Sequence, residues 1–232
     1  AGKVTDLCLT DALAVNDAGS AVGQGFPIGG GPPPAWVVFG NLDWGGYTLP
    51  ALAGGPSSPY DINAGGSDED GWRIVGTSLA ANGRTRAVRW LGSDLGMDNV
   101  HDNEIEDLGT LGGPNVDASA YGLNESGEIV GESGVGGGSE ASRAVLWAGG
   151  AIRDLRTLGG DSSVAKAIND DGVVAGSAQD AGGAWHAVLW VIERPSAAVP
   201  PAIPTPKPTP TPAGSPTPTP TPVATPTPAP GP

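Results

Sequence analysis

A short turn motif that recurs four times in the first 190 residues constrains the fold more than any other feature of the chain. Each copy has an Asn followed by a Gly two or three positions later, and the copies begin at Asn16, Asn63, Asn124 and Asn169. Successive asparagines are 47, 61 and 45 residues apart. In such turns Asn bonds its own backbone and Gly takes positive φ, so turn chemistry explains all four copies. A period in the forties made of short strands is typical of a β-propeller blade.

The same order of apolar segments surrounds every copy of the turn. A short apolar run ending in Gly follows the turn, then a variable Gly-rich loop, and then one of the segments AWVVF (35–39), RAVRW (86–90), RAVLW (143–147) and HAVLW (186–190). The last segment of the unit is IEDLGTLGG (105–113) or IRDLRTLGG (152–160), with a divergent copy, YTLPALAGG (47–55). Short β-branched runs bounded by Gly-containing turns predict strands, four in each repeat.

These patterns predict an all-β fold for the first part of the chain. There are 39 Gly residues and no convincing amphipathic helix. We expect one domain over residues 1–194, a small β-propeller of about four blades, each a four-stranded sheet. Residues 195–232 form a separate, extended tail in this interpretation.

The N-terminal stretch is offset from the rest of the repeats. Val4, Thr5, Asp6 and Leu7 match the strand that starts at Ile152, whereas the fourth repeat ends at Trp190 without a clear strand of that type. We expect the N-terminal strand to complete the last blade and remove an exposed sheet edge. The alternative is that it completes the blade of a neighbouring subunit, which would make a polymer.

The units GLNESGEIVGES (122–133), AINDDGVVAGS (167–177), HAVLW (186–190) and DLRTLGG (154–160) resemble the bacterial extracellular repeats named for a His-Ala-Phe motif. Val188 stands where that motif has Phe, and among the four copies only the last has His. The resemblance covers roughly Val4 to Trp190. It implies secretion and a β-propeller, and it brings no catalytic residues with it.

The C-terminal segment has a different composition. Residues 195–232 hold 16 of the 24 Pro residues and no aromatic residue. Such a segment is expected to adopt polyproline II, at ~3.1 Å per residue. Alternating Thr and Pro is also the composition of O-glycosylated stalks. The candidate glycosylation sites are Thr205, Thr209, Thr211, Thr217, Thr219, Thr221, Thr225 and Thr227.

Charge and motifs narrow the classes of function. The formal net charge is −14, and no surface cluster of Lys or Arg is evident, so we expect no nucleic-acid partner. No apolar run long enough for membrane insertion is present in the sequence. The motifs of nucleophilic, zinc-dependent and phosphate-binding enzymes are absent, so we expect a non-enzymatic protein. A glycoside-hydrolysing carboxylate pair stays a third hypothesis, with no particular residues favoured.

Two groups of residues are candidate binding sites. Asp94, Asp98 and Asp102 lie in an acidic insertion and offer hard oxygen ligands to calcium, the one cofactor that the sequence suggests; the alternative is a solvated acidic loop. Trp36 and Trp185 fall outside the periodic aromatic positions and are candidate platforms for sugar rings. The periodic positions, Trp90, Trp147 and Trp190 with Phe39 in the equivalent place, are expected to pack between blades.

These observations together predict a secreted structural protein, extracellular or at the cell surface. We expect a homopolymer, the subunit of a filament or surface coat, with glycans attached to the tail. The alternative is a stalked β-propeller that binds a glycan or protein through its loops at 26–34 and 91–105.

Overall fold

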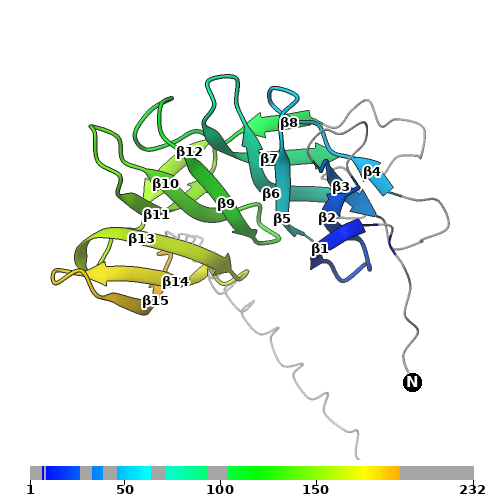
Figure 1. Ribbon diagram of the computed structural model, residues 1–232. Coiled ribbons are helices and arrows are strands. Elements are labelled where there is room, and N and C mark those ends of the chain that lie inside the picture. The colour runs from blue at the N-terminus through cyan, green and yellow to red at the C-terminus, as the bar shows by residue number, and fades with distance from the viewer. Residues whose placement is uncertain are drawn as a thin grey trace, which may run out of the picture. The chain divides into compact units, whose positions relative to one another are not determined.

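The computed structural model describes Leu7 and residues 9–26, 33–38, 46–63, 72–92 and 104–193 (Figure 1). The chain divides into two compact units, Ala1–Glu193 and Arg194–Pro232. All described residues belong to the first unit, and the Pro/Thr tail lies outside them. The described residues form strands and turns and no helix.

The strands form four antiparallel sheets, each with its strands side by side in sequence order. The first sheet contains β1 (Leu9–Val15), β2 (Ala21–Gly25), β3 (Ala35–Val38) and β4 (Gly46–Thr48). The second contains β5 (Ser57–Ile62), β6 (Trp72–Leu79), β7 (Thr85–Gly92) and β8 (Glu104–Asp107). The third contains β9 (Ala118–Leu123), β10 (Ile129–Gly134), β11 (Ser142–Ala148) and β12 (Ala151–Asp154). The fourth contains β13 (Gly159–Ile168), β14 (Val173–Asp180) and β15 (Trp185–Val191).

One sheet therefore corresponds to one sequence repeat, and the all-β prediction is confirmed. Three of the sheets have the expected four strands, and the fourth sheet has three among the described residues. The strand missing from the fourth sheet is the type that β12 supplies in the third. The sequence predicts that Val4, Thr5, Asp6 and Leu7 supply it; the first three lie outside the described residues, and Leu7 is described but belongs to no strand.

Neighbouring sheets are held together by apolar clusters, one between each successive pair. One face of each sheet packs against the opposite face of the next sheet along the chain. The first cluster joins Val22 and Val37 to Ile74, Val88 and Trp90; the second joins Val75 and Ala87 to Ile129, Val145 and Trp147; the third joins Val130 and Leu146 to Val174 and Trp190. Burying a large apolar side chain contributes roughly 1.5–3 kcal/mol, so these clusters hold the successive sheets against one another.

The pairing of strands corrects one sequence alignment. In the second sheet Gly76 pairs with Val88 and Ile74 pairs with Trp90, whereas in the first sheet Gly23 pairs with Trp36 and Ala21 pairs with Val38. Val38 therefore occupies the place of Trp90.

The expectation that Phe39 occupies that place is wrong by one residue, and Phe39 itself lies outside the described residues. The alignment matched the aromatic ends of the segments, but backbone pairing fixes the register. The packing role of the other periodic tryptophans is confirmed, because Trp90 and Trp147 are buried and Trp190 packs against the third cluster.

Candidate functional site

The repeated asparagines perform the turn role expected from the sequence. In all four copies the side-chain oxygen accepts a hydrogen bond from a backbone N–H within one residue of the start of the following strand, over 2.7 to 3.0 Å. Gly19, Gly127 and Gly172 adopt φ values of 79°, 75° and 77°. These hydrogen bonds fix the tight turn that each repeat needs.

Two of these asparagines, Asn16 and Asn124, also link successive sheets, which the sequence did not indicate. The Nδ2 of Asn16 donates to the carbonyl of Asn63 over 2.9 Å, and the Nδ2 of Asn124 donates to the carbonyl of Asn169 over 3.1 Å. Asn63 and Asn124 are buried, whereas Asn169 in the last sheet is exposed. The turn is therefore part of the contact between sheets as well as a local feature.

Every first strand of a sheet carries a β-bulge at the same place, three residues before the turn asparagine. The pairing skips one residue there in each of β1, β5, β9 and β13. The bulged residues are Leu13, Tyr60, Tyr121 and Lys166. A bulge redirects the side chain of the extra residue, and bulges are frequent beside functional sites.

The Gly that ends each apolar run explains why the bulge recurs. A Cβ on Gly131 would lie 1.9 Å from the carbonyl oxygen of Ser119, and a Cβ on Gly76 would lie 2.0 Å from that of Ser58. Gly23 and Gly176 show the same close approach. Only Gly lets the bulged strand come this near, so the repeated Gly is a backbone requirement.

The bulged residues of neighbouring sheets contact one another. The rings of Tyr60 and Tyr121 have centroids 5.4 Å apart at an angle of 53°. Nζ of Lys166 lies 3.5 Å from the ring centroid of Tyr121, a cation–π contact. We call Tyr60, Tyr121 and Lys166 the bulge row.

A partly buried carboxylate, that of Asp61, lies next to this row. Asp61 follows Tyr60 and accepts hydrogen bonds from the backbone N–H of Leu123 over 3.0 Å and from that of Ile62 over 2.9 Å. Burial raises the pKa of Asp61 above its usual range, because desolvation disfavours the charged form. Its bond to Leu123 joins the second sheet to the third.

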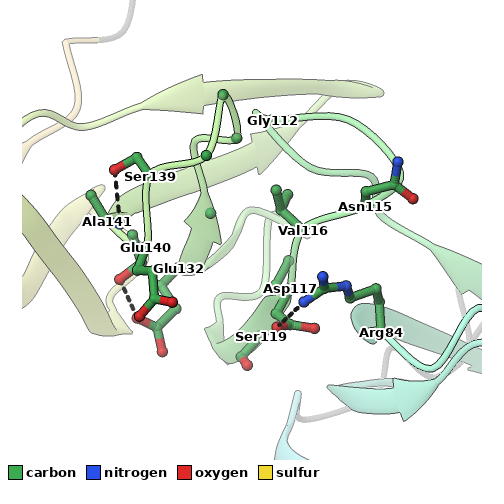
Figure 2. Close-up of a pocket in the computed structure, with 16 residues that line it drawn as sticks. Arg84, Gly112, Asn115, Val116, Asp117, Ser119, Glu132, Ser139, Glu140 and Ala141 are labelled. Carbon is green, nitrogen blue, oxygen red and sulfur yellow. Dashed lines mark hydrogen bonds and ion pairs between the residues drawn. The ribbon is translucent and has the colours of Figure 1, made fainter.

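A cavity of about 760 Å³ lies beside the third sheet (Figure 2), and one of its lining residues, Glu132, contacts Tyr121 of the bulge row. Glu132 connects the two: it accepts hydrogen bonds from the hydroxyl of Tyr121 over 2.6 Å and from Ser142 over 2.8 Å. Burial and the bond to Glu132 raise the pKa of the Tyr121 hydroxyl. On the other side Arg84 lies 3.4 Å from a carboxylate oxygen of Asp117.

The lining of the cavity is polar. It includes three carboxylates, Asp117, Glu132 and Glu140, against one guanidinium, that of Arg84. Backbone groups of the glycine loop at 136–138 complete it. Convergent carboxylate, guanidinium and backbone groups suit a hydroxyl-rich, uncharged ligand better than an anion.

The two tryptophans proposed as sugar platforms lie in different sheets. Trp36 is half-buried on β3, and its indole covers Gly25, where an added Cβ would meet it at 2.5 Å. Trp185 begins β15 and is 52% exposed. The structure does not bring them together, and of the two only Trp185 presents a largely exposed side chain.

The other candidate residues lie outside the described part of the chain. These are the proposed calcium ligands Asp94, Asp98 and Asp102 and the eight tail threonines. Within the described ranges no group of three or more His, Cys, Asp or Glu residues could hold a metal ion. The same part of the chain contains no helix that is long and apolar enough to cross a membrane.

Sequence reasoning missed the bulge row and the cavity. The bulge position holds Leu, Tyr, Tyr and Lys in the four repeats, so its residue type does not repeat. The available signal was positional: each bulged residue lies three places before a turn asparagine. No family model, curated protein or solved structure matches the chain.

Proposed function

We propose that this protein is a non-enzymatic, secreted structural subunit of an extracellular filament or surface coat. In this proposal the four sheets are the blades of a β-propeller-like array, and the threonines of the tail carry O-linked glycans. The proposal rests mainly on one observation, the apolar face that the fourth sheet leaves exposed.

That face is equivalent to the faces that the other sheets bury. Leu189 on β15 is 69% exposed, whereas Leu146 at the same place in the third sheet is 4% exposed. Val191 is 70% exposed, and Ala175 and Ala187 beside Leu189 are exposed as well. Contiguous exposed apolar side chains typically mark an interaction surface.

A contact of this kind favours a polymer. The first sheet forms the other end of the series of sheets, so a second copy that covers this face with its own first sheet would leave its own fourth sheet exposed. Such head-to-tail contacts produce filaments when the rotation between copies does not close a ring. A Pro/Thr tail of low charge is suited to displaying glycans on an assembled surface.

Electron microscopy of native full-length protein, with intact mass measured on the same sample, tests this function. We expect regular filaments or sheets and a mass above that of the polypeptide, with the excess on the tail. Truncation after Arg194 should change the oligomeric state. Isolated particles of one subunit with an unmodified tail would contradict the proposal.

The cavity beside the bulge row favours a second candidate, a stalked module that binds a glycan. Binding to a glycan panel should then be lost in Arg84→Ala, which removes the guanidinium from the lining. Arg153→Ala is a matched control, because Arg153 is exposed on β12 and is not part of the lining. Absence of binding, or equal binding by both variants, would reject this alternative.

A further inference from the structure

We propose that residues Val4 to Leu7 of a second copy add to β15 as the fourth strand of the last sheet. This inference rests on the proposed function and names the contact through which the subunits polymerise. Four features of the molecule support it: the strand order of the sheets, the pairing register, the exposure of the first and fourth sheets and the turn asparagines.

The first feature is β15, the edge strand of the fourth sheet. In the first three sheets the third strand pairs on its far side with a fourth strand, β4, β8 or β12. Among the described residues β15 pairs with β14 alone. An unpaired edge is a template for a strand from another chain.

The second feature is the register between the third and fourth strands, which is the same in the second and third sheets. Val88, Arg89 and Trp90 pair with Asp107, Glu106 and Ile105, and Val145, Leu146 and Trp147 pair with Asp154, Arg153 and Ile152. Transferring this register to β15 places Asp6 opposite Val188, Thr5 opposite Leu189 and Val4 opposite Trp190. The residue after the strand follows the same rule: the N–H groups of Leu108 and Leu155 donate to the carbonyls of Ala87 and Ala144 over 3.0 and 2.8 Å. Leu7 is accordingly placed to donate to Ala187.

A side-chain pair fits the same register. Arg86 forms a bidentate ion pair with Asp107, over 2.9 and 3.1 Å. His186 stands at the position of Arg86, and Asp6 stands at the position of Asp107. In this structure His186 instead lies 3.0 Å from Asp180 on its own hairpin. The added strand would therefore bring a second carboxylate to His186.

The third feature is the exposure, within a single chain, of the outer faces of the first and fourth sheets. Val15 on β1 is 68% exposed, whereas Ile62 at the same place in the second sheet is 5% exposed. Leu189 at the other end is 69% exposed. If the array closed on itself, these two faces would cover each other as they do between neighbouring sheets.

Chain length limits where the donated strand can lie. Val4 lies five residues before Leu9 at the start of β1, and five extended residues span about 18 Å at most. Val4 to Leu7 therefore stay close to the first sheet of their own chain. A second copy whose first sheet covers the exposed face of the fourth sheet brings the donor strand to β15.

The turn asparagines are the fourth feature, because two of them, Asn16 and Asn124, donate a hydrogen bond to the turn of the next sheet. Asn124 donates to the carbonyl of Asn169 in the next sheet. Asn169 ends this series in an exposed turn. In the proposed contact its Nδ2 donates to the carbonyl of Asn16 in the second copy, which continues the spacing of the repeats across the subunit boundary.

Cysteine cross-linking tests the contact in the full chain. All variants carry Cys8→Ser, so that the introduced cysteines supply the only thiols. Directly opposed residues of antiparallel strands have Cα atoms about 4.5–5.5 Å apart, within the range of a disulfide. Mixing a Thr5→Cys chain with a Leu189→Cys chain under mild oxidation should give a disulfide-linked heterodimer. Mixing Thr5→Cys with Ala181→Cys, in the exposed hairpin turn before β15, should give little product.

The double variant Thr5→Cys and Leu189→Cys distinguishes a second copy from the same chain. Strand donation between copies gives a ladder of disulfide-linked oligomers, whereas closure within one chain gives an internally linked monomer and overturns the inference. The Cys8→Ser parent and the cysteine variants are viewed by electron microscopy in parallel, because Leu189 belongs to the proposed contact and its replacement can itself weaken assembly. Filaments of the double variant without a cross-link between positions 5 and 189 would overturn strand donation and leave the filament function standing. Absence of both filaments and cross-links would reject both proposals.

Discussion

At the scale of single residues, one position carries backbone strain. Arg156 has φ 71° and is the non-glycine residue with positive φ among the described residues. Its N–H donates to Asp154 over 2.6 Å, as that of Gly109 donates to Asp107 over 2.9 Å in the preceding repeat. Gly109, with φ 80°, satisfies this turn without a Cβ. The hydrogen bond to the Asp side chain therefore imposes a conformation that Arg adopts at a cost.

Arg156→Gly should stabilise the fold by about 0.5–1 kcal/mol. A non-glycine residue in the left-handed conformation costs roughly 1–2 kcal/mol, which Gly avoids. Part of this gain in stability is offset, because Gly loses more conformational entropy on folding. Arg156 is exposed, so little packing is lost. The midpoint of urea unfolding should rise for Arg156→Gly and fall for the control Arg153→Gly, in strand β12. Equal shifts in both variants would contradict the strain argument.

The repeated Gly at the bulge should be intolerant of any side chain. In Gly131→Ala the new Cβ would lie 1.9 Å from the backbone oxygen of Ser119, so the bulge must shift, at a cost of about 2–3 kcal/mol or more. Gly137→Ala is the control, because its Cβ would meet nothing within 4 Å and only its φ of 65° is unfavourable. Urea unfolding should show a clearly larger loss of stability for Gly131→Ala than for Gly137→Ala. A smaller loss would mean that the bulge does not depend on this Gly.

At the scale of strands and sheets, the sequence predicts the elements better than their contacts. The Asn and Gly turn and the β-branched runs specify each hairpin locally, so four sheets follow from four repeats. The bulge at Tyr121 is not visible in residue types, because the backbone approach to Gly131 creates it and any side chain can occupy it. The alignment of Phe39 failed for a related reason: register depends on pairing partners, which a comparison of aromatic residues does not include. The cavity next to Glu132 involves loops from different repeats and could not be assembled from one repeat.

Leu146 and Leu189 occupy equivalent places in the third and fourth sheets, but Leu146 should stabilise the fold and Leu189 the contact between subunits. Leu146→Ala should cost about 2–4 kcal/mol in the free energy of unfolding, because the side chain is buried between sheets. Leu189→Ala should change the unfolding of an isolated subunit by less than about 0.5 kcal/mol, since its side chain faces solvent there.

In assembly the roles of the two leucines reverse. Sedimentation should show Leu189→Ala shifted toward single subunits. The folded fraction of Leu146→Ala, in contrast, should assemble like the unchanged protein. An assembly that Leu189→Ala leaves unchanged would place the subunit contact on another surface.

At the scale of the whole molecule, charge opposes the proposed assembly. Each chain carries a formal net charge of −14, and the proposed contact consists mainly of apolar side chains and backbone pairing. Subunits brought together therefore repel one another over the Debye length, about 30 Å at 0.01 M salt and about 8 Å at 0.15 M. Screening weakens this repulsion while it leaves the apolar contact intact.

Filament formation should consequently increase with ionic strength. Raising NaCl from 0.01 to 0.15 M should lower the protein concentration at which material pellets in the ultracentrifuge, by a factor of several. Leu189→Arg is the control: with the apolar face disrupted, it should stay in the supernatant at both salt concentrations. Filaments that dissolve as salt rises would indicate that ion pairs hold the subunits together, and the apolar face of the fourth sheet would then not be the dominant contact.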